Sequence, residues 1–95
     1  MKVVVAKDAR DQANDIDAWW RENRPEAPDM FQAELIAALQ LLADAPNTGT
    51  RYERNYRRVR LQRTRHNVFY EVDRQQDVLT VVAVWGMPKG KMPKL

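Results

Sequence analysis

The stretch VLTVVAVW, residues 78–85, carries an apolar side chain at every position except Thr80. Because it is rich in β-branched residues and is followed by Gly86 and Pro88, it reads as a strand. Successive side chains of a strand point to opposite faces, so both faces of this strand need apolar cover. Strands in the middle of a sheet have this pattern. Otherwise a partner or the basic tail covers the second face, or that face stays partly exposed.

The rest of the chain predicts one α+β domain over residues 1–95, with residues 86–95 as a basic C-terminal tail. The predicted order is a strand, a helical hairpin and three strands joined by short turns. The predicted strands are Lys2–Ala6, Tyr56–Gln62, Val68–Asp73 and Val78–Trp85. We expect a mainly antiparallel sheet of four strands with both helices packed on one face.

Two stretches have the spacing of amphipathic helices. The first places Ala9, Ala13, Ile16 and Trp20 on one face; we expect Asp8 to cap it and Pro25 to end it. The second follows with Pro28 in its first turn and ends before Pro46; its apolar stripe is Phe31, Leu35, Leu39 and Leu42. The short connection between them predicts an antiparallel hairpin.

Charge is distributed unevenly along the chain. Residues 1–50 hold five Lys/Arg and nine Asp/Glu, whereas residues 51–95 hold eleven Lys/Arg and four Asp/Glu. In the strand from Tyr56, Val59 and Leu61 alternate with Arg58 and Arg60, which places the apolar pair toward the core and the arginines outside. Such a basic face predicts contact with an anionic macromolecule, although a merely solvated sheet face explains the same pattern.

The residue types exclude most hydrolytic chemistry. The sequence has no cysteine, no serine and a single histidine, and no glycine-rich loop, so we expect no metal site and no cofactor. A metal-independent ribonuclease is the enzymatic alternative, because Arg60, Arg65, His66 and Lys89 are the right types to bind a phosphorane and move protons. Each has a simpler role as a surface residue, and Tyr70 fits a core aromatic.

Trp19 and Trp20 are adjacent, so one of them points away from the buried face of the first helix. Trp20 fits the core spacing. Trp19 then lies at the edge, either as packing between the helices or as an anchor in a protein interface.

Several segments together resemble the ParE/RelE superfamily of bacterial toxins. They are A-x-DI-x-x-WW from Ala13 to Trp20, F-x-x-EL-x-x-AL-x-x-L from Phe31 to Leu42, Pro46 with Gly49, VRLQRTRHNVFYEVD, and VVAVWG. The resemblance covers almost the whole chain. It implies the same fold, a cytoplasmic toxin of a type II toxin–antitoxin pair, and an antitoxin that wraps around the toxin.

Two activities are known in this superfamily. ParE-like members poison DNA gyrase, whereas RelE-like members cut mRNA on the ribosome. RelE-like nucleases carry an arginine where this chain has Asn67, and an arginine with a tyrosine or histidine near the C-terminus, where this chain has only lysines. These differences favour the ParE-like branch, with plasmid stabilisation and growth inhibition as its roles and ribosome-dependent cleavage as the alternative.

The resemblance and the residues together predict a set of binding positions for antitoxin or target. These are Trp19, Arg58, Arg60, Arg63, Arg65, Trp85, Lys89 and Lys91. The partners expected are the antitoxin and either DNA gyrase or the ribosome with mRNA. No membrane partner is expected, and free toxin is a candidate for homodimerisation through uncovered apolar surface.

Overall fold

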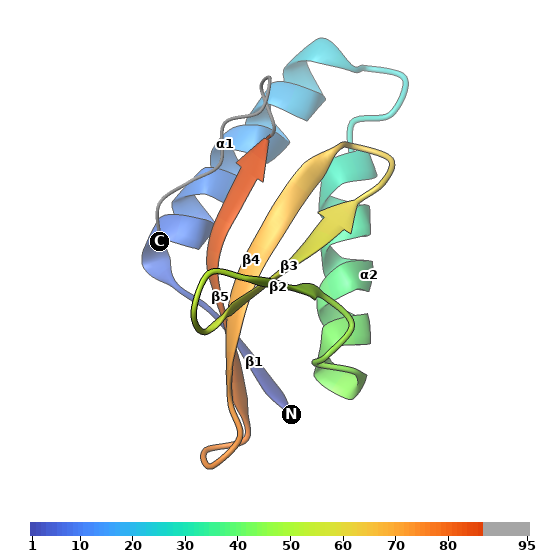
Figure 1. Cartoon of the computed structure of the whole chain (residues 1–95). Helices are drawn as coiled ribbons and strands as arrows, with labels where there is room; N and C mark the ends of the chain where they lie inside the picture. The colour runs from blue at the N-terminus through green and yellow to red at the C-terminus, as the bar shows by residue number, and fades with distance from the viewer. Residues whose placement is uncertain (87–95) are drawn as a thin grey trace.

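The computed structural model describes residues 1–86, which form two helices and five strands (Figure 1). In chain order these are β1 (Lys2–Val5), α1 (Lys7–Asn23), α2 (Met30–Asp44), β2 (Thr50–Tyr52), β3 (Tyr56–Leu61), β4 (His66–Asp73) and β5 (Val78–Gly86). The predicted α+β class and helical hairpin are confirmed. The predicted Lys89 and Lys91 lie outside the described residues.

Both helices begin slightly away from the predicted caps. Ala6 is the N-cap residue of α1, so Asp8 lies inside the first turn, where its charge complements the positive helix end. Asp29 precedes α2, and Pro28 lies outside that helix. The predicted C-terminal limits hold, because α1 ends at Asn23 before Pro25 and α2 ends at Asp44 before Pro46.

The sheet contains five strands, in the order β1-β5-β4-β3-β2, so the expectation of four was wrong. The additional strand, β2, has three residues and pairs antiparallel with β3. β1 pairs with β5 in parallel, and the other pairs are antiparallel. β5 therefore lies between β1 and β4, which accounts for its apolar character on both faces.

One irregularity in the β4–β5 pair shapes the middle of the sheet. Phe69 pairs with Ala83 and Tyr70 pairs with Val81, so Val82 is an extra residue in β5. The bulge explains why Val81 and Val84, three positions apart, both lie in the core.

Both helices pack against one face of the sheet, which we call the covered face (Figure 1). Its core comprises Ala9, Phe31 and Leu42 from the helices and Leu61, Val68, Tyr70, Leu79, Val81 and Val84 from the strands. Val59 packs against this cluster, so the predicted inward positions of Val59 and Leu61 are confirmed. The backbone N–H of Val84 also donates to Gln12 Oε1 at 2.8 Å, which joins β5 to α1.

The opposite side, which we call the outer face, is not uniformly open. Phe69 and Ala83 are only 0% and 3% exposed, and the Tyr52 ring lies 4.8 Å from the Phe69 ring. Val4 at the β1 edge is 37% exposed, and Trp85 is half-buried. The second face of β5 is thus shielded at its centre and accessible at its margins.

Candidate binding surface

The predicted arginines of β3 lie on the outer face. Arg58 pairs in register with Phe69, and Arg60 pairs with Asn67, while Val59 and Leu61, which alternate with these arginines, face the helices. Directly opposite residues of an antiparallel pair share a face. Arg58 is half-buried and Arg60 is exposed.

Three side chains that carry hydrogen-bond donors form a row across the outer face. Arg60 is opposite Asn67, and Asn67 is opposite Trp85. Asn67 is 1% exposed, and among the described residues neither its Nδ2 nor the Nε1 of Trp85 has a hydrogen-bond partner. A buried donor without an acceptor costs about 1–3 kcal/mol. This donor row therefore combines the exposed guanidinium of Arg60 with two buried N–H groups that no described residue pairs.

Arg63 and Arg65 lie in the turn between β3 and β4, which a carboxylate from α2 holds in place. Glu34 Oε2 accepts from the Arg63 N–H at 2.7 Å, and Oε1 accepts from the Thr64 N–H at 3.0 Å and the Thr64 hydroxyl at 2.7 Å. The Arg65 N–H donates to the Leu61 carbonyl at 2.8 Å and closes the turn. The two arginine side chains are exposed, so the turn presents them on a fixed backbone.

These bonds also set the ionisation of Glu34. Burial alone would raise its pKa, but the hydrogen bonds from Arg63 and Thr64 and the positive charge of Arg63 lower the pKa below the ordinary 4.5. Glu34 is therefore a carboxylate at neutral pH. Its role in holding the turn was not foreseen, because it comes 29 residues before Arg63 and nothing local links the two.

His66 lies on the covered face, on the other side of the sheet from Arg60. It pairs with Leu61, and its ring packs edge-on against Phe31 at 5.3 Å between centroids. Burial lowers its pKa below the ordinary 6.5, with a partial offset from the Thr64 backbone and the Glu34 charge. Two members of the candidate nuclease set, Arg60 and His66, therefore project from opposite faces.

Tyr70 is buried in the core, as predicted, and its hydroxyl has a structural role. Its hydroxyl donates to the Pro46 carbonyl at 2.7 Å and accepts from the Gly49 N–H at 2.9 Å. Gly49 has no room for a side chain, since an added Cβ would lie 2.6 Å from this hydroxyl. The pair fixes the loop after α2 against the sheet.

Trp19 lies in the helical layer and is 49% exposed. Its ring meets the Trp20 ring edge-on at 5.9 Å, and Trp20 packs against the core as predicted. Trp19 is thus available to a partner, but on the other side of the sheet from Arg58 and Arg60.

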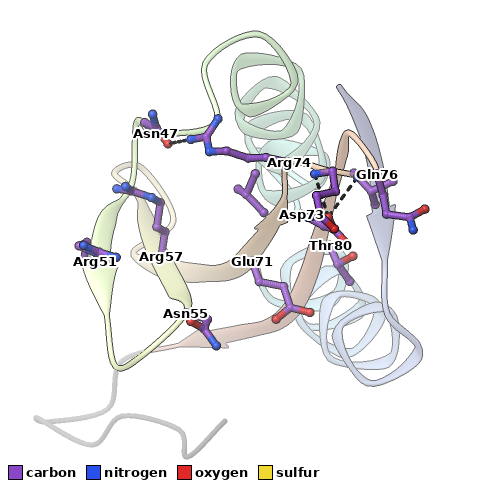
Figure 2. Close-up of a pocket in the computed structure, with 12 residues that line it drawn as sticks. Asn47, Arg51, Asn55, Arg57, Glu71, Asp73, Arg74, Gln76 and Thr80 are labelled. Atoms are coloured by element: carbon purple, nitrogen blue, oxygen red, sulfur yellow. Dashed lines mark hydrogen bonds between the residues drawn. The ribbon is translucent and has the colours of Figure 1, made fainter.

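A hollow of about 750 Å³ lies at the end of the sheet formed by the β2–β3 and β4–β5 hairpins (Figure 2). Three arginines that the sequence analysis did not select, Arg51, Arg57 and Arg74, line it. One signal was available in the sequence: Arg57 alternates in phase with Val59 and Leu61, which places a charge on the core side of β3.

Comparison with known proteins connects this geometry to a family. Residues 3–87 match the model for the ParE toxin of the type II toxin–antitoxin system, parDE. The chain belongs to the ParE toxin family. The ParE/RelE resemblance is thereby confirmed, and the protein is a type II toxin of that superfamily. No curated protein matches the sequence.

Two solved structures share the fold of this ParE family member. In the intact E. coli RelBE toxin–antitoxin complex, a chain matches with a TM-score of 0.59 and 13% identity, covering 93% of this chain and 98% of that one. The isolated E. coli RelE toxin gives the same TM-score and identity, covering 95% and 87%.

Two further observations concern residues 1–86. Within them, no three His, Cys, Asp or Glu side chains gather closely enough to hold a metal ion. Neither helix there is both long and apolar enough to cross a membrane.

Proposed function

We propose that this ParE family toxin inhibits growth by binding DNA gyrase, and that a cognate antitoxin neutralises it in the cytoplasm. The observation that carries the proposal is the family match along residues 3–87. The absence of the RelE-type arginine at Asn67 supports the gyrase branch. The RelBE complex, as a structural relative, supports an antitoxin partner.

The contact set in this proposal falls on two sides of the molecule. Arg58, Arg60 and Trp85 lie on the outer face, with Arg63 and Arg65 in the adjoining turn, and Lys89 and Lys91 lie outside the described residues. Trp19 lies in the helical layer. An antitoxin that reaches both sides has to wrap around the domain, whereas gyrase needs only one of them.

The chemistry of the outer face suits a protein partner. Arginine binds carboxylates through paired, charge-assisted hydrogen bonds, and the Asn67 and Trp85 donors suit carbonyl oxygens. Pairing these donors requires the partner to displace the groups that bury them, and a pair formed in this way would add to the binding free energy.

A supercoiling assay with purified gyrase tests the proposal. We expect the purified protein to inhibit supercoiling and to accumulate gyrase-cleaved DNA. Arg60→Ala should weaken inhibition about tenfold, the loss of one charge-assisted contact. Arg10→Ala, which removes one exposed charge from α1, is the matched control. Full supercoiling at excess wild-type protein would contradict the gyrase assignment.

The same material tests the alternative, a ribosome-dependent mRNA endonuclease. Toe-printing on programmed ribosomes should show no A-site cleavage, because Arg60 and His66 do not face a common site. Cleavage there would replace gyrase by the ribosome as target. Induced expression without growth arrest would instead leave only a binding module.

The antitoxin is tested separately. We expect a short reading frame beside the gene to encode a DNA-binding protein whose co-expression restores growth. Failure of every neighbouring frame to restore growth would contradict the pairing.

A further inference from the structure

The hollow between the two hairpins contains a repulsive arrangement of charges. Arg51 of β2 and Arg57 of β3 pair directly in register, so their side chains share a face. Like charges at directly opposite positions destabilise an antiparallel pair. Arg74, from the turn after β4, lines the same hollow and adds a third guanidinium (Figure 2).

The contacts of these arginines orient them without neutralising them. Arg57 Nη1 donates to the Gly49 carbonyl at 2.8 Å, and Arg74 Nη2 donates to Asn47 Oδ1. Both acceptors are neutral. Within residues 1–86, none of the three arginines forms an ion pair, so the positive charge of this wall is uncompensated.

The other wall carries carboxylates. Asp73 Oδ1 accepts the backbone N–H groups of Gln75 and Gln76 at 3.0 and 3.1 Å, so it is occupied in its own turn. Glu71 also lines the hollow from β4, but it is opposite Tyr56 and Thr80 on the outer face, and its carboxylate points away from Arg51 and Arg57 (Figure 2). Among the described residues, neither carboxylate forms an ion pair with the arginine wall.

This lining discriminates between classes of ligand. None of the side chains that line the hollow is aromatic, so no platform exists for stacking a nucleic-acid base. Carboxamides such as Asn47, Asn55 and Gln76 instead suit the N–H and C=O groups of a polypeptide. The volume lies in the usual range for ligand sites.

We propose that this hollow binds an acidic polypeptide segment of a partner protein, with a carboxylate held between Arg51 and Arg57. Arg74 extends the positive wall. The inference rests on the proposed function only in taking the partner to be a protein. The site is separate from the donor row and offers a second attachment point on the toxin.

Binding of a fluorescein-labelled hexaglutamate peptide to the full chain, followed by anisotropy at low salt, tests the site. Arg51→Ala should weaken binding about tenfold, and Arg51→Ala with Arg74→Ala should weaken it further. Arg51→Lys should recover only part of the loss, because lysine keeps the charge but not the forked geometry. Arg57 is left intact because it holds the Gly49 carbonyl.

Arg54→Ala is the matched control, since Arg54 is an exposed arginine in the neighbouring turn and does not line the hollow. It should change the Kd by about twofold or less. Equal losses for Arg51→Ala and Arg54→Ala would overturn the proposal, as would no binding by the wild type. Tighter binding of hexathymidylate than of hexaglutamate at the same salt would overturn the choice of a polypeptide.

The assay contains neither gyrase nor antitoxin, so the two proposals fail independently. If the protein does not inhibit gyrase but still binds hexaglutamate through Arg51, the proposed target is wrong and the proposed binding site stands. If the protein inhibits gyrase but does not bind hexaglutamate, the proposed binding site is wrong and the proposed target stands.

Discussion

The two faces of the sheet are built from alternate residues of the same strands, yet the tyrosine buried on one face and the asparagine buried on the other differ in their hydrogen bonding. On the covered face the Tyr70 hydroxyl both donates and accepts, to Pro46 and from Gly49. On the outer face Asn67 Nδ2 and Trp85 Nε1 are buried without acceptors among the described residues.

This difference indicates that residues that stabilise the fold and residues that bind a partner lie on opposite faces of the sheet. They are not confined to different segments of the chain. The covered face stabilises the fold through packing and the paired Tyr70 hydroxyl, although His66 Nδ1 on that face has no partner among the described residues. The outer face keeps unsatisfied donors and arginines, an arrangement that is unfavourable in the free protein and typical of a functional surface. Substitutions at consecutive positions of one strand should therefore have unlike effects.

The largest effect is expected for consecutive residues of β3. Leu61→Ala removes a side chain that is 2% exposed and should lower the free energy of unfolding by about 2–5 kcal/mol. Arg60→Ala should change it by about 0.5 kcal/mol or less, since Arg60 is exposed. Urea denaturation of both variants measures the contrast. Comparable losses would mean that the outer face also stabilises the fold.

Tyr70→Phe should have the next largest effect. It leaves the Gly49 N–H and the Pro46 carbonyl without their partner and should cost about 1–3 kcal/mol. Tyr56→Phe, at a half-buried position of the outer face, is the control and should cost much less. Equal thermal shifts for the two variants would contradict the role given to the Tyr70 hydroxyl.

Asn67→Leu should leave the free energy of unfolding unchanged or raise it by up to about 1 kcal/mol. Leucine has nearly the shape of asparagine and removes the unpaired donor. The same variant should weaken partner binding, so stability and binding should move in opposite directions. A loss of stability similar to that of Tyr70→Phe would show that the amide is already satisfied in the free protein.

The smallest effect concerns pH. The pKa of Glu34 is lower in the folded chain than its ordinary 4.5, so the folded state binds fewer protons there. Its contribution to stability is therefore present above about pH 4.5 and is lost as the pH falls through the folded pKa. Urea titrations of wild type and Glu34→Gln should differ most at neutral pH and converge under acid conditions. A constant difference down to pH 3 would exclude this linkage.

Much of the fold was predictable because its signals are local. Helical spacing located both helices, and alternation placed Val59 and Leu61 inward and Arg58 outward. β2 was missed because three residues, Thr50 to Tyr52, are too few to show a period, and their strand geometry depends on pairing with β3.

The candidate site was less predictable because it depends on contacts between distant segments. Glu34 meets the β3–β4 turn only after α2 packs on the sheet. Arg51, Arg57 and Arg74 share a hollow only because two hairpins converge at one end of the sheet. The register of β3 with β4, which aligns Arg60 with Asn67, is likewise a property of the assembled sheet.

The parallel pairing of β1 with β5 has a consequence for the order of events during synthesis. β1 is made first, but its only neighbour in the sheet is the strand made last. The nascent chain therefore cannot finish its central pairing until residues 78–86 have left the ribosome. Completion of the sheet is therefore a late event, which follows the synthesis of nearly all of the described chain.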